Sequence, residues 1–390
     1  MIVTPLSDRD TAVRDALLSH GWEGDLARLA AGGLGAAAFH VAGLSADVIE
    51  AMVPLAARLG LELLTGDDWL IILGGRSRFG AFARPWMQPE AVRPLATAIG
   101  MALPAEDRRE WRHARGAIDT TRARIVGVIN VTPDSFSDRG AALSVPAALR
   151  QAELLLDGGA TILDIGGEST RPGAVEVPLE VELARVIPVL EALTAGFPAV
   201  PLSVDTVHAA TAVAAMTAGA CIVNDVTAGR HDPALLAVAA RERAGLVLSH
   251  SRGPLARLAS YDAAQYGGDV TGHVARELDA AMAGALAAGI TREQIVLDPG
   301  FGFSKTAAQS LVLLNQLDAV TALGRPVLVG VSRKRFLGEA TGRGIDDRER
   351  ATAAACALAF ERGARLFRVH DAAAVRDAIA VAEAVAGVAE

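Results

Sequence analysis

Lysine and cysteine are scarce in this sequence of 390 residues. Of its 37 basic residues only two, Lys305 and Lys334, are lysines, and only Cys221 and Cys356 are cysteines. The cysteines lie in apolar stretches without metal-ligand spacing, which argues against a disulfide framework and predicts two small core residues. Because a lysine ammonium is compact and its pKa shifts on burial, the two lysines are candidates for roles that arginine cannot fill. Chance survival of two lysines is the alternative.

Long apolar runs and basic clusters are also missing. No run approaches the length of a membrane span, and the amino-terminus lacks a basic flank followed by an apolar stretch, so we expect a soluble, cytoplasmic protein with no membrane partner. The net charge of −8 and the lack of lysine- or arginine-rich runs argue against a nucleic-acid partner. With 51% hydrophobic residues the chain can bury a large core, and its length suggests one large domain and a smaller one.

The first 118 residues differ from the rest and contain all four tryptophans. The spacing of apolar residues predicts short helices and strands, namely helices at 8–20, 46–59 and 88–101, a strand at 36–41, and paired strands at 61–64 and 69–73. The charged, non-periodic segment 104–122 resembles a linker, which places a domain boundary near residue 120. We find no ligand cluster, nucleophile arrangement or phosphate loop before it. We therefore expect a small α+β amino-terminal domain, residues 1–118, with a packing or assembly role.

From residue 124 onward an apolar strand and an Ala- and Leu-rich helix alternate eight times. The predicted strands are at 124–131, 162–166, 201–205, 221–226, 245–250, 295–298, 326–332 and 365–370. The predicted helices are at 145–158, 178–195, 208–218, 232–243, 269–288, 307–323, 346–362 and 372–387. Eight such units predict an α/β fold, a closed (β/α)8 TIM barrel rather than an open sheet. We expect this barrel to form the second domain, residues 122–390.

Polar residues cluster where the predicted strands end. The first strand is apolar on one face at Val126 and Val128 and then presents Asn130 on the same face. Similar changes occur at the other strand ends, in the runs 164–173, 203–206, 223–225, 249–252, 297–306, 330–335 and 368–371. A single Asp or Asn at such a point is usually a helix cap or turn residue, but eight at one mouth are not explained by capping. The pattern predicts a site at this end of the barrel.

Asn130, Arg368 and His370 form one predicted group. Positions 368 and 370 share a face of the last strand, which neighbours the first strand in a closed barrel. Arginine, imidazole and amide groups around one point indicate an anion site, and a diphosphate with a divalent cation fits it, with Asn130 offering the cation an oxygen ligand. The alternative is that Arg368 and His370 form an ion pair with Asp371 or cap a helix.

A second predicted group, on other strands, consists of Asp205, Asn224, Asp298 and Lys334. Two accepting carboxylates, an amide and a donating ammonium can recognise a flat heterocycle that has an amidine-like edge and a carbonyl. Burying these groups without a ligand costs about 1 to 3 kcal/mol for each unpaired one, so a ligand is expected. The alternative is an internal salt bridge of Asp205 or Asp298 with Arg333 or Lys334.

Six runs of the sequence together resemble the dihydropteroate synthase family, in that family's order. They are 130–138 (NVTPDSFSD), 166–173 (GGESTRPG), 203–206 (SVDT), 298–303 (DPGFGF), 331–334 (VSRK) and 368–371 (RVHD). The resemblance covers about residues 122–388. It implies a (β/α)8 barrel, usually a homodimer, that joins 6-hydroxymethyl-7,8-dihydropterin diphosphate to p-aminobenzoate in folate biosynthesis and releases diphosphate. Members of the family are targets of sulfonamides, which mimic the benzoate.

The resemblance also implies a role for each matching residue. The pterin would be held by Asp205, Asn224, Asp298 and Lys334, and the diphosphate with Mg2+ by Asn130, Arg368 and His370. The benzoate site would consist of Phe136, Thr170, Arg171, Pro172, Phe303 and Ser332. Catalysis, which would fall to Asp205, Lys334, Arg368 and His370, would be mainly electrostatic, with charge separating as the bond to diphosphate breaks.

Two positions depart from the family pattern. Ser251 follows the histidine of the fifth strand, where a long side chain is common, and would leave the pterin wall less filled. Ser304 stands where glycine is frequent and would stiffen the loop slightly. Two alternatives remain, a pterin-dependent methyltransferase, which has no diphosphate to hold, and a non-catalytic pterin-binding barrel.

Overall fold

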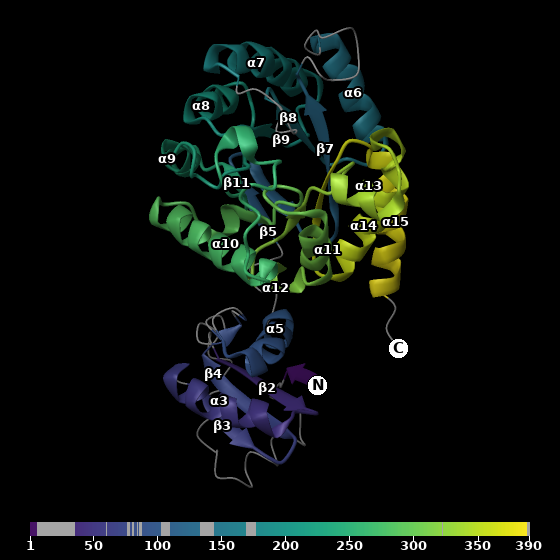
Figure 1. Ribbon diagram of the computed structural model, residues 1–390. Coiled ribbons are helices and arrows are strands. Elements are labelled where there is room, and N and C mark those ends of the chain that lie inside the picture. Colours follow the sequence, from purple (N-terminus) through teal and green to yellow (C-terminus); the bar gives the residue numbers. More distant parts are fainter. Residues whose placement is uncertain are drawn as a thin grey trace. The chain divides into compact units, whose positions relative to one another are not determined.

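The chain forms two compact units in a computed structural model (Figure 1). The structure describes residues 1–5, 36–59, 61–75, 79, 82–83, 85, 88–102, 110–132, 144–168, 177–321 and 323–387. One unit comprises Met1–Ala105, and the other comprises Glu106–Thr321 with Arg325–Glu390. Among the described residues, no helix is long and apolar enough to cross a lipid bilayer.

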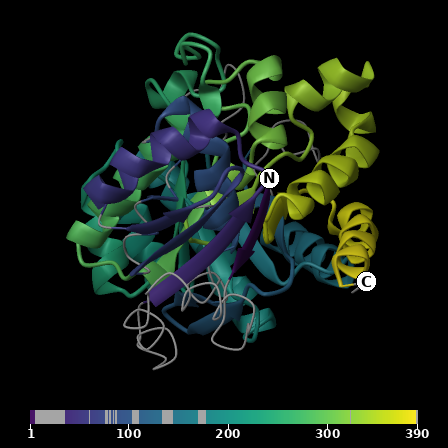
Figure 2. The ribbon, with the colours of Figure 1, turned by 90° about the horizontal axis from the view of Figure 1, so that it is seen from below.

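The amino-terminal unit is a four-stranded antiparallel sheet with helices (Figure 2). Its elements are β1 (Ile2–Pro5), β2 (Ala36–Ala42), α3 (Ala46–Leu59), β3 (Glu62–Thr65), β4 (Trp69–Gly75), η2 (Glu90–Val92) and α5 (Arg93–Ala102), and the strand order is β1-β2-β4-β3. Apolar side chains of α3, α5, β2 and β4 form its core, including Phe39, Met52, Leu70 and Ile99. The predicted strand pair and the predicted helix at 46–59 are confirmed. The helix predicted at 8–20 lies outside the described residues.

The second unit is the expected barrel of eight parallel strands. They are β7 (Arg124–Asn130), β8 (Ile162–Gly166), β9 (Leu202–Asp205), β10 (Ile222–Asp225), β11 (Gly245–Ser249), β12 (Ile295–Asp298), β13 (Leu328–Val329) and β14 (Leu366–Val369). Each strand pairs in parallel with the next, and β14 returns to β7, as predicted. A parallel bridge between Leu297 and Val327 brings β12 and β13 together and closes the barrel.

Helices follow the strands around the barrel and match the predicted positions with two differences. They are α6 (Val145–Asp157), α7 (Leu179–Gly196), α8 (Ala209–Thr217), α9 (Ala234–Arg241), α10 (Val270–Ala287), α11 (Ala307–Asn315), α12 (Asp318–Thr321), α13 (Arg335–Thr341), α14 (Glu349–Glu361) and α15 (Ala372–Ala386). The helix predicted at 307–323 is divided into α11 and α12. The helix α13 was not predicted; it starts directly after Lys334 and ends at Gly342, whose φ of +70° allows the left-handed cap. The last two helices, α14 and α15, pack together (Figures 1 and 2).

The segment predicted to be a linker is instead a β-hairpin of the barrel unit. It consists of β5 (Glu110–His113) and β6 (Gly116–Asp119), with Trp111 opposite Ile118. Both side chains are buried in a cluster with residues at the beginning of the barrel strands, such as Val126 and Val296. The Trp111 indole Nε1 donates to the carbonyl of Gln294 at 2.9 Å. Charged residues surround Trp111 and mask the alternation of apolar and polar residues that would indicate strands. The division between units falls after Ala105, earlier than the boundary expected near residue 120.

This hairpin leads to a prediction about where the chain can be shortened. A chain that begins at Glu106 keeps Trp111 and Ile118. We expect its melting temperature to be close to that of the barrel in the full chain. A chain that begins at Arg122 lacks both, and removal of a buried tryptophan costs about 3 to 5 kcal/mol. Thermal unfolding followed by circular dichroism compares the two. Equal melting temperatures would show that the hairpin contributes nothing to the barrel's stability.

Candidate active site

A polar layer crosses the barrel directly above an apolar one. Four alternate strands contribute the apolar side chains Ile162, Ile222, Val296 and Leu366, which are buried together. Two residues later on the same strands stand Asp164, Asn224, Asp298 and Arg368. Side chains two apart on a strand share a face, and in a TIM barrel alternate strands supply one layer. The carboxyl ends of β8, β10, β12 and β14 therefore meet in a layer that has two carboxylates, an amide and a guanidinium.

Arg368 joins the two predicted groups through a pair of short ion pairs. Its Nε donates to Asp164 Oδ2 and its Nη2 to Asp205 Oδ2, both at 2.6 Å. Asn224 Nδ2 donates to the same Asp164 oxygen at 3.2 Å. Asp164 is 1% exposed. Arg368 thus does not pair with Asp371, whose carboxylate caps α15 by accepting from the Ala374 amide.

Asp205 lies beside Asn130 at the mouth of the barrel. The two residues flank Gly166 on neighbouring strands, and a Cβ at Gly166 would lie 3.7 Å from Asp205 Oδ2 and 3.8 Å from Asn130 Oδ1. Both oxygens therefore approach the same space. Burial raises the pKa of Asp205 to about 7, with the positive charge of Arg368 opposing this and the negative charge of Asp164 adding to it. The protonation state of Asp205 therefore depends on the charges of Arg368 and Asp164.

Asp298 is held by donors on both of its oxygens. Oδ1 accepts from the Gly300 amide at 2.8 Å and Oδ2 accepts from Ser249 Oγ at 3.2 Å. Its side chain is buried, and burial raises its pKa above the ordinary range. These two donors fix the plane of the carboxylate in the floor of the site.

Lys334 is placed by an unusual backbone turn. The preceding residue, Arg333, has a φ of +58°, and the Arg348 guanidinium donates to the Arg333 carbonyl at 2.9 Å. Lys334 Nζ lies 4.1 Å from the centre of the Phe303 ring, a cation–π contact. Burial, together with the nearby charge of Arg368, lowers the pKa of Lys334 to about 8.

The internal salt bridge that we considered as an alternative is not the arrangement seen. Arg333 Nε pairs with Glu349 Oε1 at 2.5 Å, and Asp205 pairs with Arg368. The negative charges of Asp205 and Asp298 lie near Lys334. Within the described part of the chain, however, Lys334 forms no hydrogen bond with either carboxylate.

His370 and Ser332 lie together at the rim. Ser332 Oγ is 3.0 Å from His370 Nδ1 and accepts from the His370 amide at 3.3 Å. This contact connects the loop after β13 to the end of β14. His370 follows directly after β14, and its side chain lines the same cavity as Arg368.

One cavity of about 530 Å³ opens above this layer, a size suited to a small organic ligand. Members of both predicted groups line it, together with Ser332: Asn130, Asp205, Lys334, Arg368 and His370. Asn224 and Asp298 lie in the layer beneath. The structure therefore brings the heterocycle group and the anion group to one site. The remaining predicted residues, Phe136, Thr170, Arg171 and Pro172, lie outside the described residues.

Asp164 is the site residue that our sequence reasoning missed. It was noted only as a carboxylate of the loop after the second strand. The signal that could have found it is its position two residues after Ile162, because Asp298 stands two residues after Val296 in the same layer. Within the described residues, no cluster of three His, Cys, Asp or Glu side chains could hold a metal ion by itself.

Comparisons with known proteins agree with this geometry. A family model described as pterin binding enzyme matches residues 126–370. The chain is 43% identical to a dihydropteroate synthase of Synechocystis over 268 residues, which are 67% of this chain and 90% of that protein. The structure of a Xanthomonas albilineans dihydropteroate synthase with 4-aminobenzoic acid is similar to this one, with a TM-score of 0.67 and 45% identity, and 72% of this chain and 100% of that chain are covered.

A second Xanthomonas albilineans structure extends the comparison to a product. It is a dihydropteroate synthase in complex with 7,8-dihydropteroate, with a TM-score of 0.63 and 43% identity over 70% of this chain and 97% of that chain. The family match covers most of the barrel and both groups of site residues. This chain belongs to the pterin-binding enzyme family, among its dihydropteroate synthases.

Proposed function

We propose that this chain joins 6-hydroxymethyl-7,8-dihydropterin diphosphate to p-aminobenzoate and releases diphosphate. The observation that carries the proposal is the single cavity that Asp205 and Lys334 line together with Asn130, Arg368 and His370. A heterocycle and the anion attached to it need those two sets of groups within the length of one small molecule. The similarity to proteins solved with 4-aminobenzoic acid and with 7,8-dihydropteroate supports the choice of substrates.

The pterin ring is proposed to lie on the polar layer. Two buried acceptors of that layer, Asp164 Oδ1 and Asn224 Oδ1, have no hydrogen-bond partner among the described residues. Each such atom costs about 1 to 3 kcal/mol when left unpaired. The N–H groups of a pterin would satisfy acceptors of this kind, while Lys334 would donate to the ring carbonyl.

The diphosphate is proposed to lie at the rim, against Arg368 and His370. Mg2+ prefers oxygen ligands and keeps several of them from water and substrate phosphates, so one protein ligand is enough. Asn130 Oδ1, which approaches the same space as Asp205 Oδ2, is the residue that fits this role. When bound there, the metal would neutralise negative charge on the leaving group.

The reaction needs charge stabilisation more than proton transfer. The C–O bond to diphosphate breaks and its electron pair leaves with the diphosphate, so positive charge develops on the methylene carbon. The arylamine nitrogen then forms the C–N bond and loses its proton to solvent. Asp205 is proposed to stabilise the cation, and Arg368 and His370 the departing oxygens. Because an arylamine is neutral at pH 7, we assign no general base.

The benzoate is proposed to bind above Phe303 and Ser332. Phe303 is buried with its ring against Lys334, and Ser332 lines the cavity. We assign Phe136, Thr170, Arg171 and Pro172 to the same subsite on the basis of their sequence motifs.

We further propose that the protein is a homodimer and that residues 1–118 serve packing or assembly. Light scattering of the full chain and of a chain starting at Glu106 would test both proposals.

One assay tests the function and separates it from the two alternatives. The purified protein is mixed with the pterin diphosphate, p-aminobenzoate and Mg2+, and diphosphate release is measured. A synthase releases diphosphate only when both substrates are present. Pterin binding without release would favour a non-catalytic barrel, and methyl transfer from a folate donor would favour a methyltransferase.

Replacement of Lys334 by alanine is expected to raise KM for both substrates and lower kcat/KM by 10-fold or more, about 1.4 kcal/mol. The change removes an ammonium that faces both the pterin group and the Phe303 ring. Steady-state kinetics of diphosphate release measure it. Arg350→Ala, which removes an exposed cation on α14, is the control and should leave both constants unchanged. Unaltered kinetics in Lys334→Ala would mean that its assignment is wrong.

A further inference from the structure

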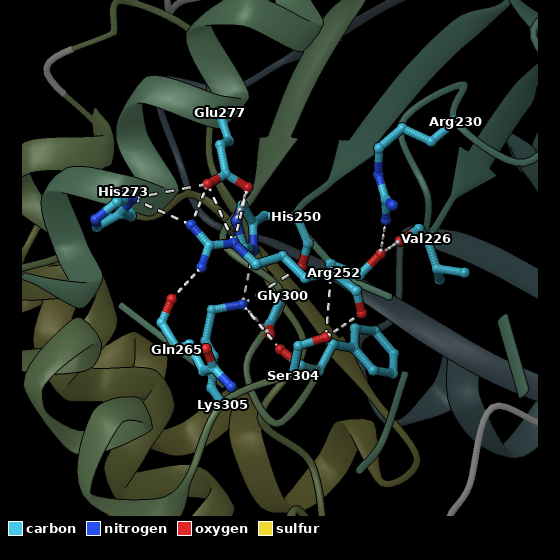
Figure 3. Close-up of polar contacts among 12 residues, drawn as sticks. Val226, Arg230, His250, Arg252, Gln265, His273, Glu277, Gly300, Ser304 and Lys305 are labelled. Atoms are coloured by element: carbon cyan, nitrogen blue, oxygen red, sulfur yellow. Dashed lines mark hydrogen bonds and ion pairs between the residues drawn. The ribbon is translucent and has the colours of Figure 1, made fainter. Parts of the chain in front are cut away.

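The second lysine, Lys305, has no role in the reaction proposed above, yet it is 1% exposed and heavily bonded. It ends the loop that follows β12. Its Nζ lies 2.9 Å from His250 Nδ1, 3.0 Å from the Gly300 carbonyl and 3.0 Å from the Phe303 carbonyl (Figure 3). One buried ammonium therefore holds two points of its own loop and the end of β11.

A neutral His250 ring and a charged Lys305 satisfy the donors and acceptors of this network. His250 Nε2 lies 3.1 Å from Glu277 Oε2, and a carboxylate can only accept, so Nε2 carries the proton. Nδ1 is then an acceptor, and the three N–H groups of a charged Lys305 match its three nearest acceptors. Burial, and the charge of Lys305 next to it, lower the pKa of His250 to about 3, which agrees with a neutral ring.

The network continues to a neighbouring loop through Glu277 of α10. Arg252 Nε donates to both carboxylate oxygens of Glu277 at 3.1 Å, as Figure 3 shows. The Arg252 amide donates to Ser304 Oγ at 2.9 Å, and that hydroxyl donates to the Arg252 carbonyl at 2.6 Å. Ser304, at a φ of +50°, thus bonds the loop after β12 to the loop after β11. These two bonds are the physical reason to expect a stiffer loop with a serine at this position.

The other departure, Ser251, joins the same region. Its Oγ donates to the Val226 carbonyl and accepts from Arg230 Nη2, both at 2.7 Å. The hydroxyl therefore ties the ends of β10 and β11 together. Where the family pattern has a long side chain, this chain therefore has a hydroxyl that connects two loops by hydrogen bonds.

The Lys305 contacts hold a loop that borders the cavity, and Gly302 and Lys305 of this loop line the cavity together with Lys334. Lys305 bonds the Phe303 carbonyl, and the ring of Phe303 lies under the Lys334 ammonium. Gly302, next to Phe303, is so close that a Cβ there would lie 3.3 Å from Lys334 Cδ. A shift of this loop would move Phe303 and Lys334 together.

We propose that Lys305 is a positioning residue for the synthase reaction, which holds Phe303 and Lys334 as one wall through the Gly300 and Phe303 carbonyls. The inference rests on the proposed function. Arginine cannot replace lysine here, because its planar fork cannot direct three N–H groups to acceptors arranged around one nitrogen. That explains why this position keeps one of only two lysines in the chain.

The test is Lys305→Met, which keeps the length of the side chain and removes its donors. We expect KM for p-aminobenzoate to rise by 10-fold or more and KM for the pterin diphosphate to rise by a smaller factor, because Lys334 shifts with the loop while Asn224 and Asp298 in the layer below still hold the ring. Lys305→Gln, whose amide still donates two hydrogen bonds, is expected to recover part of the loss. It also supplies the measurement if Lys305→Met does not fold.

A double-mutant cycle distinguishes positioning from general stability. If Lys305 acts through Phe303, adding Lys305→Met to Phe303→Leu changes KM for p-aminobenzoate by less than 3-fold, whereas independent effects multiply. Trp111→Phe, which lowers stability at the other end of the barrel, is the control and should leave both KM values unchanged. If the two effects multiply in the double variant, or if Lys305→Met has the KM of the wild type, the inference about Lys305 is overturned while the proposed function is not. A wild-type chain that releases no diphosphate would overturn the proposed function as well.

Discussion

Replacement of Arg368 by glutamine is expected to lower kcat/KM by 100-fold or more, about 2.7 kcal/mol. The change leaves Asp164 and Asp205 without the cation that both contact at 2.6 Å, and it removes a proposed donor to the departing diphosphate. Breaking a buried ion pair by removing one partner is strongly unfavourable, so the melting temperature should also fall. Steady-state diphosphate release and thermal unfolding measure the two effects.

Arg368→Lys separates the charge of Arg368 from its geometry. A lysine keeps the positive charge but presents a point rather than a planar fork, so it cannot bridge two carboxylates in the same way. We expect an activity between that of the wild type and that of Arg368→Gln. The matched control is Arg376→Gln on α15, whose exposed guanidinium contacts Asp377 and the Asp157 carbonyl at the surface, away from the site. Turnover within 3-fold of wild type in Arg368→Gln would contradict the proposed site.

Replacement of Asp298 by asparagine is expected to weaken binding of the pterin substrate by 100-fold or more, about 2.7 kcal/mol. An asparagine can keep its carbonyl oxygen on the Gly300 amide, and its NH2 then faces Ser249 Oγ, which can rotate to accept, so the side chain stays in place while one acceptor becomes a donor. The same amide would also face N–H groups of the pterin. Calorimetric titration with the pterin diphosphate measures the dissociation constant.

The shape of asparagine makes this substitution informative, because the side chain fills the same volume and the barrel should remain folded. Asp318→Asn is the control: Asp318, at the start of α12, is also a partly buried carboxylate, whose pKa burial raises, but it belongs neither to the polar layer nor to the cavity lining. Its pterin affinity should equal that of the wild type. Pterin binding that is equally tight in Asp298→Asn would remove Asp298 from the recognition of the ring.

The barrel strands were predictable because their apolar runs are separated by regular Ala- and Leu-rich helices. All eight were placed within a few residues, and β14 was correctly placed beside β7. The hairpin with Trp111 was not predicted, since only two of its residues are large, apolar and buried, and the others are charged, polar or small. Helix α13 was missed because its seven residues are too few to show a period.

The candidate site was predictable as a set of residues, though not as a set of contacts. Polar side chains at the ends of parallel strands must meet at one mouth, which is why Asp205 and Arg368, 163 positions apart, were placed in one site. The sequence alone therefore determined the fold class and the family, and it predicted the end of the barrel at which the proposed site lies. It also singled out Lys305 and Lys334 by composition.

The tertiary structure decided which of these groups bond to each other. Arg368 is held by Asp164 and Asp205 because strands β8, β9 and β14 present those side chains at adjoining levels of the barrel. Lys305 bonds main-chain carbonyls and His250, a partnership that no residue pattern encodes. Ion pairs and hydrogen bonds depend on distances of a few ångströms between distant segments, and these distances exist only after the strands have closed into a barrel.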